Sequence, residues 1–195
     1  MDAKLSNCGG KMKNINGLPL YLLLLPINLI VAFIAVILSP ILPLFASEDG
    51  WLPTWLWWFQ TPDAPIDGDS GWKDLYKHPY VNKLPRYLRR VLWLCRNPSY
   101  GFNWTVLASK PLPKEWTYEG DLDCDNSVLS NTRKVTKITV FCGEYFHKRY
   151  YRKIGSTNRC FQLNYGWNMH ELCKNGKQEG VKAKYRFTPK LGKIN

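Results

Sequence analysis

Residues 18–46 read LPLYLLLLPINLIVAFIAVILSPILPLFA and contain no charged side chain. A helix rises roughly 1.5 Å per residue, so about twenty apolar residues cross the roughly 30 Å hydrocarbon core of a bilayer. The stretch is long enough to span a membrane once and too short to span it twice. It predicts a membrane segment, and the rest of the chain is placed relative to it.

The remainder of the 195-residue chain is long enough for one soluble domain with its own core. The formal net charge is +12, and the basic excess lies after residue 69. Such an excess suits an anionic partner, either a phosphate backbone or an acidic lipid surface. The alternative is an ordinary solvated surface.

The polar tail at residues 1–17 precedes the apolar stretch, as in a signal peptide or a signal anchor. The stretch is longer than a cleavable apolar region and ends on bulky residues, which favours an anchor. Lys11 and Lys13 lie just before it, whereas the first basic residue after it is Lys73. Basic residues stay on the cytoplasmic side, so we expect a single span with the N-terminus inside and the C-terminus outside. The four prolines of the stretch allow a re-entrant hairpin instead, with both ends on the cytoplasmic side.

Four tryptophans follow the apolar stretch, at Trp51, Trp55, Trp57 and Trp58. An indole ring combines a large apolar body with one N–H donor, so it favours the headgroup region of a membrane. The sequence therefore predicts an interfacial belt. The alternative is that these rings pack in the soluble core.

Three carboxylates, Asp63, Asp67 and Asp69, lie in a loop rich in proline and glycine. Carboxylate clusters can bind a hard cation such as Ca²⁺, although the spacing does not fit an EF-hand. Aspartates in such a loop also form turns by accepting hydrogen bonds from nearby backbone N–H groups. The turn is the favoured interpretation, and a metal-dependent hydrolase using the three residues is an alternative function.

Residues 83–96, KLPRYLRRVLWLCR, predict a basic amphipathic helix that starts at Asn82 and stops at Asn97. Its apolar stripe, predicted to face the domain core, is formed by Leu84, Leu88, Val91, Leu92 and Cys95. The opposite face carries Arg86, Arg89 and Arg90, which could also contact acidic lipid at a membrane interface.

Beyond residue 103 the apolar period changes from helical to alternating, which indicates antiparallel strands. Strands are predicted at 134–142, 145–154, 161–167 and 181–187, with turns at Gly143 and at residues 155–158. In the third strand we expect Phe161, Leu163, Tyr165 and Trp167 to face inward and Gln162 to face solvent. Four strands in series predict a meander with the basic helix packed on one face.

Seven basic residues near the strands are candidates for contact with an anionic partner: Lys148, Arg149, Arg152, Lys153, Lys182, Lys184 and Arg186. The first four lie among tyrosines, and the last three are predicted to form a row on the last strand. Cations between aromatic rings can bind nucleic acid. Lysines on an exposed strand also prevent edge-to-edge association, so nucleic acid is the less favoured partner.

In four segments the sequence resembles a family of small, uncharacterised tailed-bacteriophage proteins with an apolar N-terminal segment. The four segments are WLPTWLWWFQTPDAPIDGDSGW (51–72), RRVLWLCRNPSYGFNW (89–104), RCFQLNYGW (159–167) and YRFTPKLG (185–192). The resemblance implies a phage protein acting in a bacterial host. It implies no activity, catalytic residue or ligand.

The sequence thus predicts an α+β protein: a polar tail (1–17), a transmembrane segment (18–46), an interfacial and acidic segment (47–82), and a basic helix with a β-rich domain (83–195). It shows no catalytic or cofactor motif. The predicted function is a non-catalytic accessory protein at the host inner membrane, with lipid and a host or phage protein as partners. A membrane-tethered module that binds nucleic acid or anionic lipid is the alternative. Five cysteines follow the apolar stretch, and their pairing is open.

Overall fold

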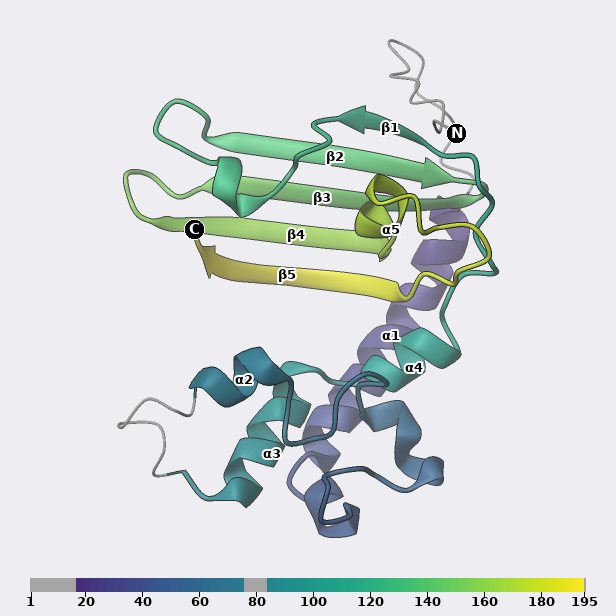
Figure 1. Cartoon of the computed structure of the whole chain (residues 1–195), viewed down its shortest axis with the longest axis vertical. Helices are drawn as coiled ribbons and strands as arrows, with labels where there is room; N and C mark the ends of the chain where they lie inside the picture. Colours follow the sequence, from purple (N-terminus) through teal and green to yellow (C-terminus); the bar gives the residue numbers. More distant parts are fainter. Residues whose placement is uncertain (1–16, 76–83, 195) are drawn as a thin grey trace. The chain divides into compact units, whose positions relative to one another are not determined.

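The computed structural model describes residues 17–75 and 84–194 (Figure 1). The chain divides into two compact units. The sheet unit contains the described residues up to 23 together with residues 108–194, and the helical unit contains the described residues of 24–107. The sequence placed the boundary before residue 83 instead, so that the basic helix and the strands formed one domain.

Helix α1, Leu18–Leu38, is formed by the apolar stretch and continues through Pro26. It is the one helix among the described residues that is long and apolar enough to cross a membrane. Its first six residues, up to Leu23, belong to the sheet unit and the rest to the helical unit.

The sheet has five antiparallel strands in chain order: β1 Thr117–Gly120, β2 Val135–Cys142, β3 Tyr145–Lys153, β4 Arg159–Trp167 and β5 Tyr185–Lys193. The predicted α+β fold and meander are confirmed. Gly143 and Gly155 have positive φ values of 58° and 52°, which glycine adopts without steric cost, and they form the two predicted turns. The short strand β1 was not predicted.

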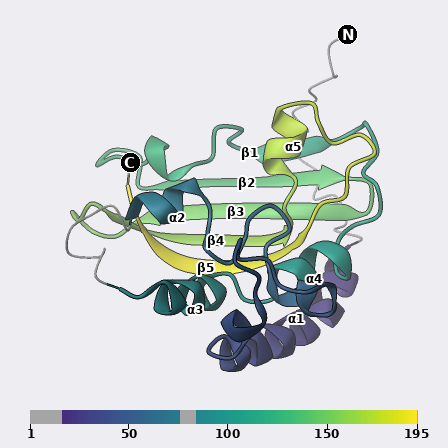
Figure 2. The ribbon, with the colours of Figure 1, turned by 60° about the horizontal axis from the view of Figure 1, so that its bottom comes forward.

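Side chains alternate between the two faces of the sheet, and both faces are partly covered. One face carries Gln162 and Asn164, and it is covered by α5, His170–Lys174, and by the loop that contains the short helix η3, Asn126–Val128. Figures 1 and 2 both show α5 over one end of the strands. The other face carries aromatic rings, and Tyr21 of α1 packs on four of them, Phe146, Tyr165, Trp167 and Tyr185.

The predicted orientation of β4 is therefore only half right. Gln162 is 5% exposed, although it was expected to face solvent. Phe161 and Leu163 are half-buried on the other face, and of the four β4 side chains expected to face inward only Trp167 is fully buried. Alternation gives the period correctly, but it does not reveal that the polar side chains form the more deeply covered face.

The last strand starts later than predicted. Val181 to Lys184 precede β5, and Lys184 is buried, so the expected row of basic side chains does not form. Residues 181 and 183 instead bond to residues 112 and 109 through their backbones.

The helical unit contains, besides most of α1, η1 Leu42–Phe45, η2 Thr54–Phe59, α2 Ser70–Leu75, α3 Arg86–Arg96 and α4 Tyr100–Thr105. Its core is formed by Leu42, Leu52, Leu56, Ala64, Ile66, Trp72, Trp93 and Leu94. These residues come mainly from loops and short helices, and Leu38 at the C-terminal end of α1 packs against them.

The predicted core face of α3 is wrong. Trp93, Leu94 and Arg90 are buried, whereas Leu88 and Leu92 of the expected stripe are more than 40% exposed. The helix turns Arg90 inward, where it pairs with the partly buried carboxylate of Asp67, as described below. Asn97 ends the helix as predicted, and Asn82 lies outside the described residues.

Candidate functional site

A polar pocket of about 490 Å³ lies on the covered face of the sheet. It is lined by Asp125, Asn126, Arg149, Tyr151, Gln162, Asn164, Asn168, Glu171, Arg186, Lys190, Gly192 and Lys193. Strand pairing explains the grouping, since Arg149 lies opposite Asn164, Tyr151 opposite Gln162, and Arg186 opposite Gly166. We call this site the sheet pocket.

Arg149 is held firmly at one side of the sheet pocket. Its guanidinium donates to Tyr151 Oη at 2.8 Å, to Glu171 Oε1 at 2.7 Å and to Asp125 Oδ2 at 3.2 Å. Only 11% of its side chain is exposed. Burial by itself lowers the pKa of Arg149, but Tyr151 and Glu171 outweigh this and raise it. Its charge is therefore matched within the protein.

Two histidines, His147 and His170, link the strands to α5 and to the covering loop next to this arrangement. His147 Nδ1 accepts a hydrogen bond from the backbone N–H of His170, so its proton lies on Nε2. Burial, together with the neighbouring charges of Arg186, Arg149 and His170, lowers the pKa of His147 well below its usual value. His170 Nε2 lies 2.9 Å from the carbonyl of Leu122, which fixes α5 to the covering loop.

Arg186 lies at the other side of the sheet pocket in a different environment. Its guanidinium donates to Asn168 Oδ1 at 3.0 Å and to Thr188 Oγ1 at 3.4 Å, both neutral groups. Within the described chain it forms no ion pair with a carboxylate. Burial lowers the pKa of Arg186, and the nearby Arg149 lowers it further.

Asn164 is 4% exposed, and its Oδ1 atom has no hydrogen-bond partner within the described part of the chain. A buried acceptor without a partner costs on the order of 1–3 kcal/mol, so such atoms call for an explanation. Asn164 and Gln162 were not identified from the sequence. A possible signal was the occurrence of two amides at alternate positions of one strand.

Of the seven basic residues predicted to contact an anion, the structure brings only Arg149 and Arg186 into this pocket. Lys148 and Arg152 lie on the opposite face by alternation, and Lys153 donates to the carbonyl of Thr157. Lys182 is exposed before β5.

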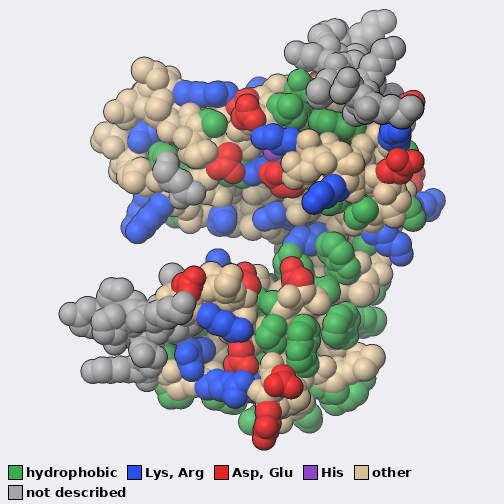
Figure 3. Space-filling model, viewed as in Figure 1, with side chains coloured by type: hydrophobic (Ala, Val, Ile, Leu, Met, Phe, Trp, Pro, Cys, Tyr) green, Lys and Arg blue, Asp and Glu red, His purple; other side chains and the backbone are tan. Residues whose placement is uncertain are grey.

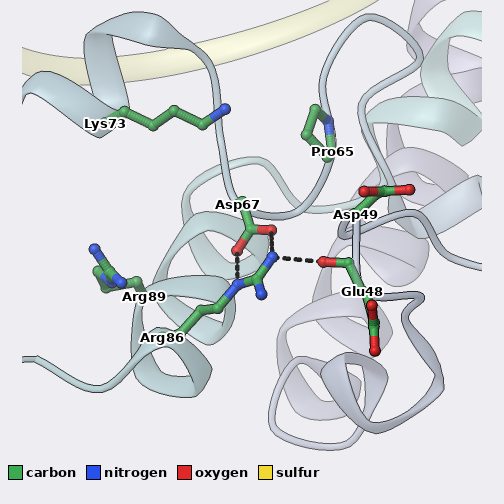
Figure 4. A pocket seen from close by; sticks show the side chains of 7 residues that line it. All are labelled: Glu48, Asp49, Pro65, Asp67, Lys73, Arg86 and Arg89. Atoms are coloured by element: carbon green, nitrogen blue, oxygen red, sulfur yellow. Dashed lines mark hydrogen bonds and ion pairs between the residues drawn. The ribbon is translucent and has the colours of Figure 1, made fainter.

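The acidic loop forms a second, smaller site in the helical unit. Asp67 accepts two hydrogen bonds from Arg86, at 2.9 and 2.5 Å, and two from Arg90, both at 2.9 Å. Figure 4 shows Arg86 between Asp67 and the carbonyl of Glu48, in a pocket of about 400 Å³. Burial alone would raise the pKa of Asp67, but the two guanidinium groups outweigh it and lower the pKa far below its usual range.

The structure does not gather the three loop carboxylates around one point. Asp69 accepts from the N–H of Trp72 at the start of α2, which is the predicted turn role. Across residues 17–75 and 84–194, no three His, Cys, Asp or Glu side chains are arranged to hold a metal ion. Of the predicted interfacial arginines, Arg86 and Arg90 are engaged with Asp67, and Arg89 lines the same pocket.

The predicted interfacial tryptophans lie at the surface of the helical unit. Trp55 is 70% exposed and Trp58 50% exposed, while Trp51 and Trp57 stack with ring centroids 6.3 Å apart. The same segment contributes Leu52 and Leu56 to the core. Figure 3 shows hydrophobic side chains gathered on the visible face of this unit.

These features define an α+β protein with an apolar N-terminal helix and a polar pocket on its sheet. The chain belongs to the family of unknown function DUF7338, whose model matches residues 12–194. No match was found among curated proteins or among solved structures.

Proposed function

We propose that this protein is a non-catalytic accessory protein that attaches to a membrane through α1 and presents its basic sheet unit at the membrane surface. The observation that carries the proposal is the exposure of the apolar side chains of α1. Ten of them are at least 40% exposed: Leu20, Leu22, Leu23, Ile27, Leu29, Ile30, Phe33, Ile34, Val36 and Ile37. An apolar surface of this extent is costly in water and marks contact with lipid or protein.

The apolar surface of the helical unit extends past the end of α1. Leu44 and Phe45 are at least 50% exposed, and Phe45 packs against exposed Trp55 with ring centroids 5.6 Å apart. Tryptophans beside an apolar helix are typical of the boundary between hydrocarbon and headgroups. This supports lipid as the partner of the surface.

The packing of α1 supports an attachment with both ends on one side of the membrane. Tyr21 is 3% exposed and contacts Trp167 and Tyr185, which come after α1 in the chain. In a single crossing, residues after Leu38 would lie across the bilayer from Tyr21. Since α1 is the one candidate span in the described chain, we propose that it lies along one leaflet.

The buried side of α1 fits this orientation. Tyr21, Asn28, Ala35 and Ser39 are each at most 5% exposed and recur seven, seven and four residues apart, along one stripe. Two of the four are polar, so the polar groups face protein while the broad apolar face is open. A single span with the N-terminus inside, which the flanking lysines favour, is the competing topology.

The resemblance to tailed-bacteriophage proteins suggests the setting. We propose the inner membrane of a bacterial host as the membrane, and a host or phage protein as the partner of the presented sheet unit. A basic unit fixed beside an acidic leaflet gains further attraction from the surface potential.

Membrane attachment is tested by fractionating cells that express the full chain. We expect the protein to sediment with membranes and to stay there after washing at high salt. Replacing Ile30 and Phe33 together by Asp should release it, whereas Leu191→Asp, at an exposed apolar position of the sheet unit, should not. Recovery of the unaltered protein in the soluble fraction would refute attachment.

Topology is tested separately with epitope tags at both ends and protease digestion of sealed inner-membrane vesicles. Attachment to one leaflet predicts that both tags are cleaved or both are protected. Protection of one tag alone would refute it and support the single span.

A further inference from the structure

We propose that the sheet pocket binds the phosphate group of a hydroxylated phosphate ester, with Arg186 as the principal cation and Asn164 as the acceptor for a hydroxyl group. This binding site goes beyond membrane attachment and does not depend on the binding of α1 to lipid.

Arg186 supplies the charge. Among the described residues its two hydrogen-bond partners, Asn168 and Thr188, are neutral, and the nearby Arg149 is already paired with carboxylates. A partly buried guanidinium without an anion has lost solvation and gained no ion pair. An anionic oxygen in the pocket would restore that loss, and guanidinium groups match phosphate by paired N–H donors.

Arg149 has a different role. Asp125, Glu171 and Tyr151 already fix and neutralise it, so it shapes one side of the pocket and supplies little free charge. At the rim, Lys190 and Lys193 add two cations. Four basic and two acidic side chains therefore line the sheet pocket, and the excess positive charge lies on the side of Arg186.

Asn164 indicates the second feature of the ligand. Asn164 lines the pocket, and its buried Oδ1 has no hydrogen-bond partner among the described residues, so it has the capacity to accept one hydrogen bond. A bare inorganic anion has few donors to offer, whereas a hydroxyl group beside the phosphate supplies one. The pocket volume of about 490 Å³ lies in the usual range of small-molecule sites, roughly 300–1,000 Å³.

This chemistry occurs in two sources, a soluble sugar or polyol phosphate and the headgroup of a glycerol-bearing phospholipid. The test uses the full chain in micelles of a neutral detergent. In the first arm, glycerol 3-phosphate is titrated by calorimetry, with glycerol as the control. In the second arm, phosphatidylglycerol or phosphatidylcholine is mixed into the micelles, and the rise in thermal midpoint is measured.

We expect saturable binding in the first arm or a stabilisation specific to phosphatidylglycerol in the second. Arg186→Gln should weaken either effect by at least about tenfold, because it removes a charge-assisted contact. Arg152→Gln, which removes the same charge from an exposed position on the opposite face, should leave it unchanged. Lys190→Gln, at the exposed rim, should weaken binding less than Arg186→Gln. Because Lys190 is exposed, this variant should fold normally, so it tests the charge of the pocket even if the Arg186 variant does not fold.

Binding in the first arm assigns a soluble phosphate ester, and an effect confined to the second assigns the lipid headgroup. Absence of both effects would overturn the proposal. So would equal losses from Arg186→Gln and Arg152→Gln, which would indicate attraction to net charge alone.

Discussion

Tyr21 stacks on Tyr185 with ring centroids 4.8 Å apart and an interplanar angle of 14°. Tyr185 Oη donates to the backbone carbonyl of Tyr21 at 3.0 Å, and Tyr21 Oη donates to the carbonyl of Arg186 at 3.2 Å. The first turn of α1 is thus part of the sheet core. An apolar segment that reads as an independent anchor is joined to a strand 164 residues later in the chain.

Replacing Tyr21 by Ala should therefore destabilise the sheet unit. The change removes a ring that contacts four aromatic side chains, and such truncations cost about 3–5 kcal/mol. Thermal unfolding of the full chain, followed by near-ultraviolet circular dichroism, measures the effect. Leu23→Ala, at a position 68% exposed, serves as the control and should leave the midpoint nearly unchanged.

The faces of β4 give a second prediction, the reverse of what the alternation alone predicts. Gln162→Lys should be the more damaging change, since Gln162 is buried between strands and donates to Cys160 Sγ at 3.3 Å. Leu163→Lys should cost less, because Leu163 is half-buried and a lysine there can extend its ammonium group to solvent. A lower thermal midpoint for Leu163→Lys than for Gln162→Lys would show that the aromatic face is the better covered one.

Local signals explain which parts of the fold could be predicted. The strands β2 to β4 could be predicted from the alternation of apolar and polar residues and from the glycines between them, which the structure places at positive φ. Both signals lie within segments of about ten residues. The pocket could not be predicted, because Arg149 and Arg186 meet only through strand pairing across three strands. Asn164 was missed because a polar residue in an alternating strand is normally assigned to solvent.

The face of α3 shows the same limit. Its apolar stripe indicates a core contact by Leu88 and Leu92, yet the buried contact is made by Arg90 with Asp67, 23 residues earlier. The spacing of apolar residues along a helix does not reveal a partner that lies 23 residues away in the sequence.

Cys142 and Cys173 provide a test of compartment. Both are buried, and each thiol lies close enough to shift the pKa of the other, while Cys142 Sγ donates to the carbonyls of Pro113 and Glu115. The neighbouring Cys142 thiol and burial raise the pKa of the Cys173 thiol, so Cys173 stays protonated in a reducing cytoplasm. We expect them to form a disulfide if the sheet unit is exported to an oxidising compartment.

The measurement is alkylation with a maleimide polymer after denaturation, with and without prior reduction. A shift that requires reduction and disappears in Cys142→Ser indicates export. Complete labelling without reduction indicates a cytoplasmic sheet unit. Cys124→Ser is the matched control, because Cys124 is equally buried but contacts the carbonyl of Arg149 instead of a thiol.

The last prediction concerns the acid sensitivity of the helical unit. Asp67 is charged and paired in the folded protein, and its folded pKa lies below the unfolded value of about 4. A group with a depressed folded pKa stabilises the fold fully above the unfolded pKa. The stabilisation is lost as the pH falls from about 4 through the folded pKa.

Asp67→Asn should remove this contribution and leave Arg90, whose side chain is 10% exposed, without its anion. We expect a loss of about 2–4 kcal/mol at neutral pH, because breaking a buried pair strands a charge. The loss should shrink as the pH is lowered below 4, since the carboxyl group of the unfolded chain then binds a proton and the charged folded form contributes less net stability. Denaturant unfolding of both proteins at pH 7 and at pH 3 measures the difference, with Asp63→Asn as the control. A difference that is the same at both pH values would show that Asp67 acts through its shape and hydrogen bonds, and that its charge contributes nothing to the stability of the unit.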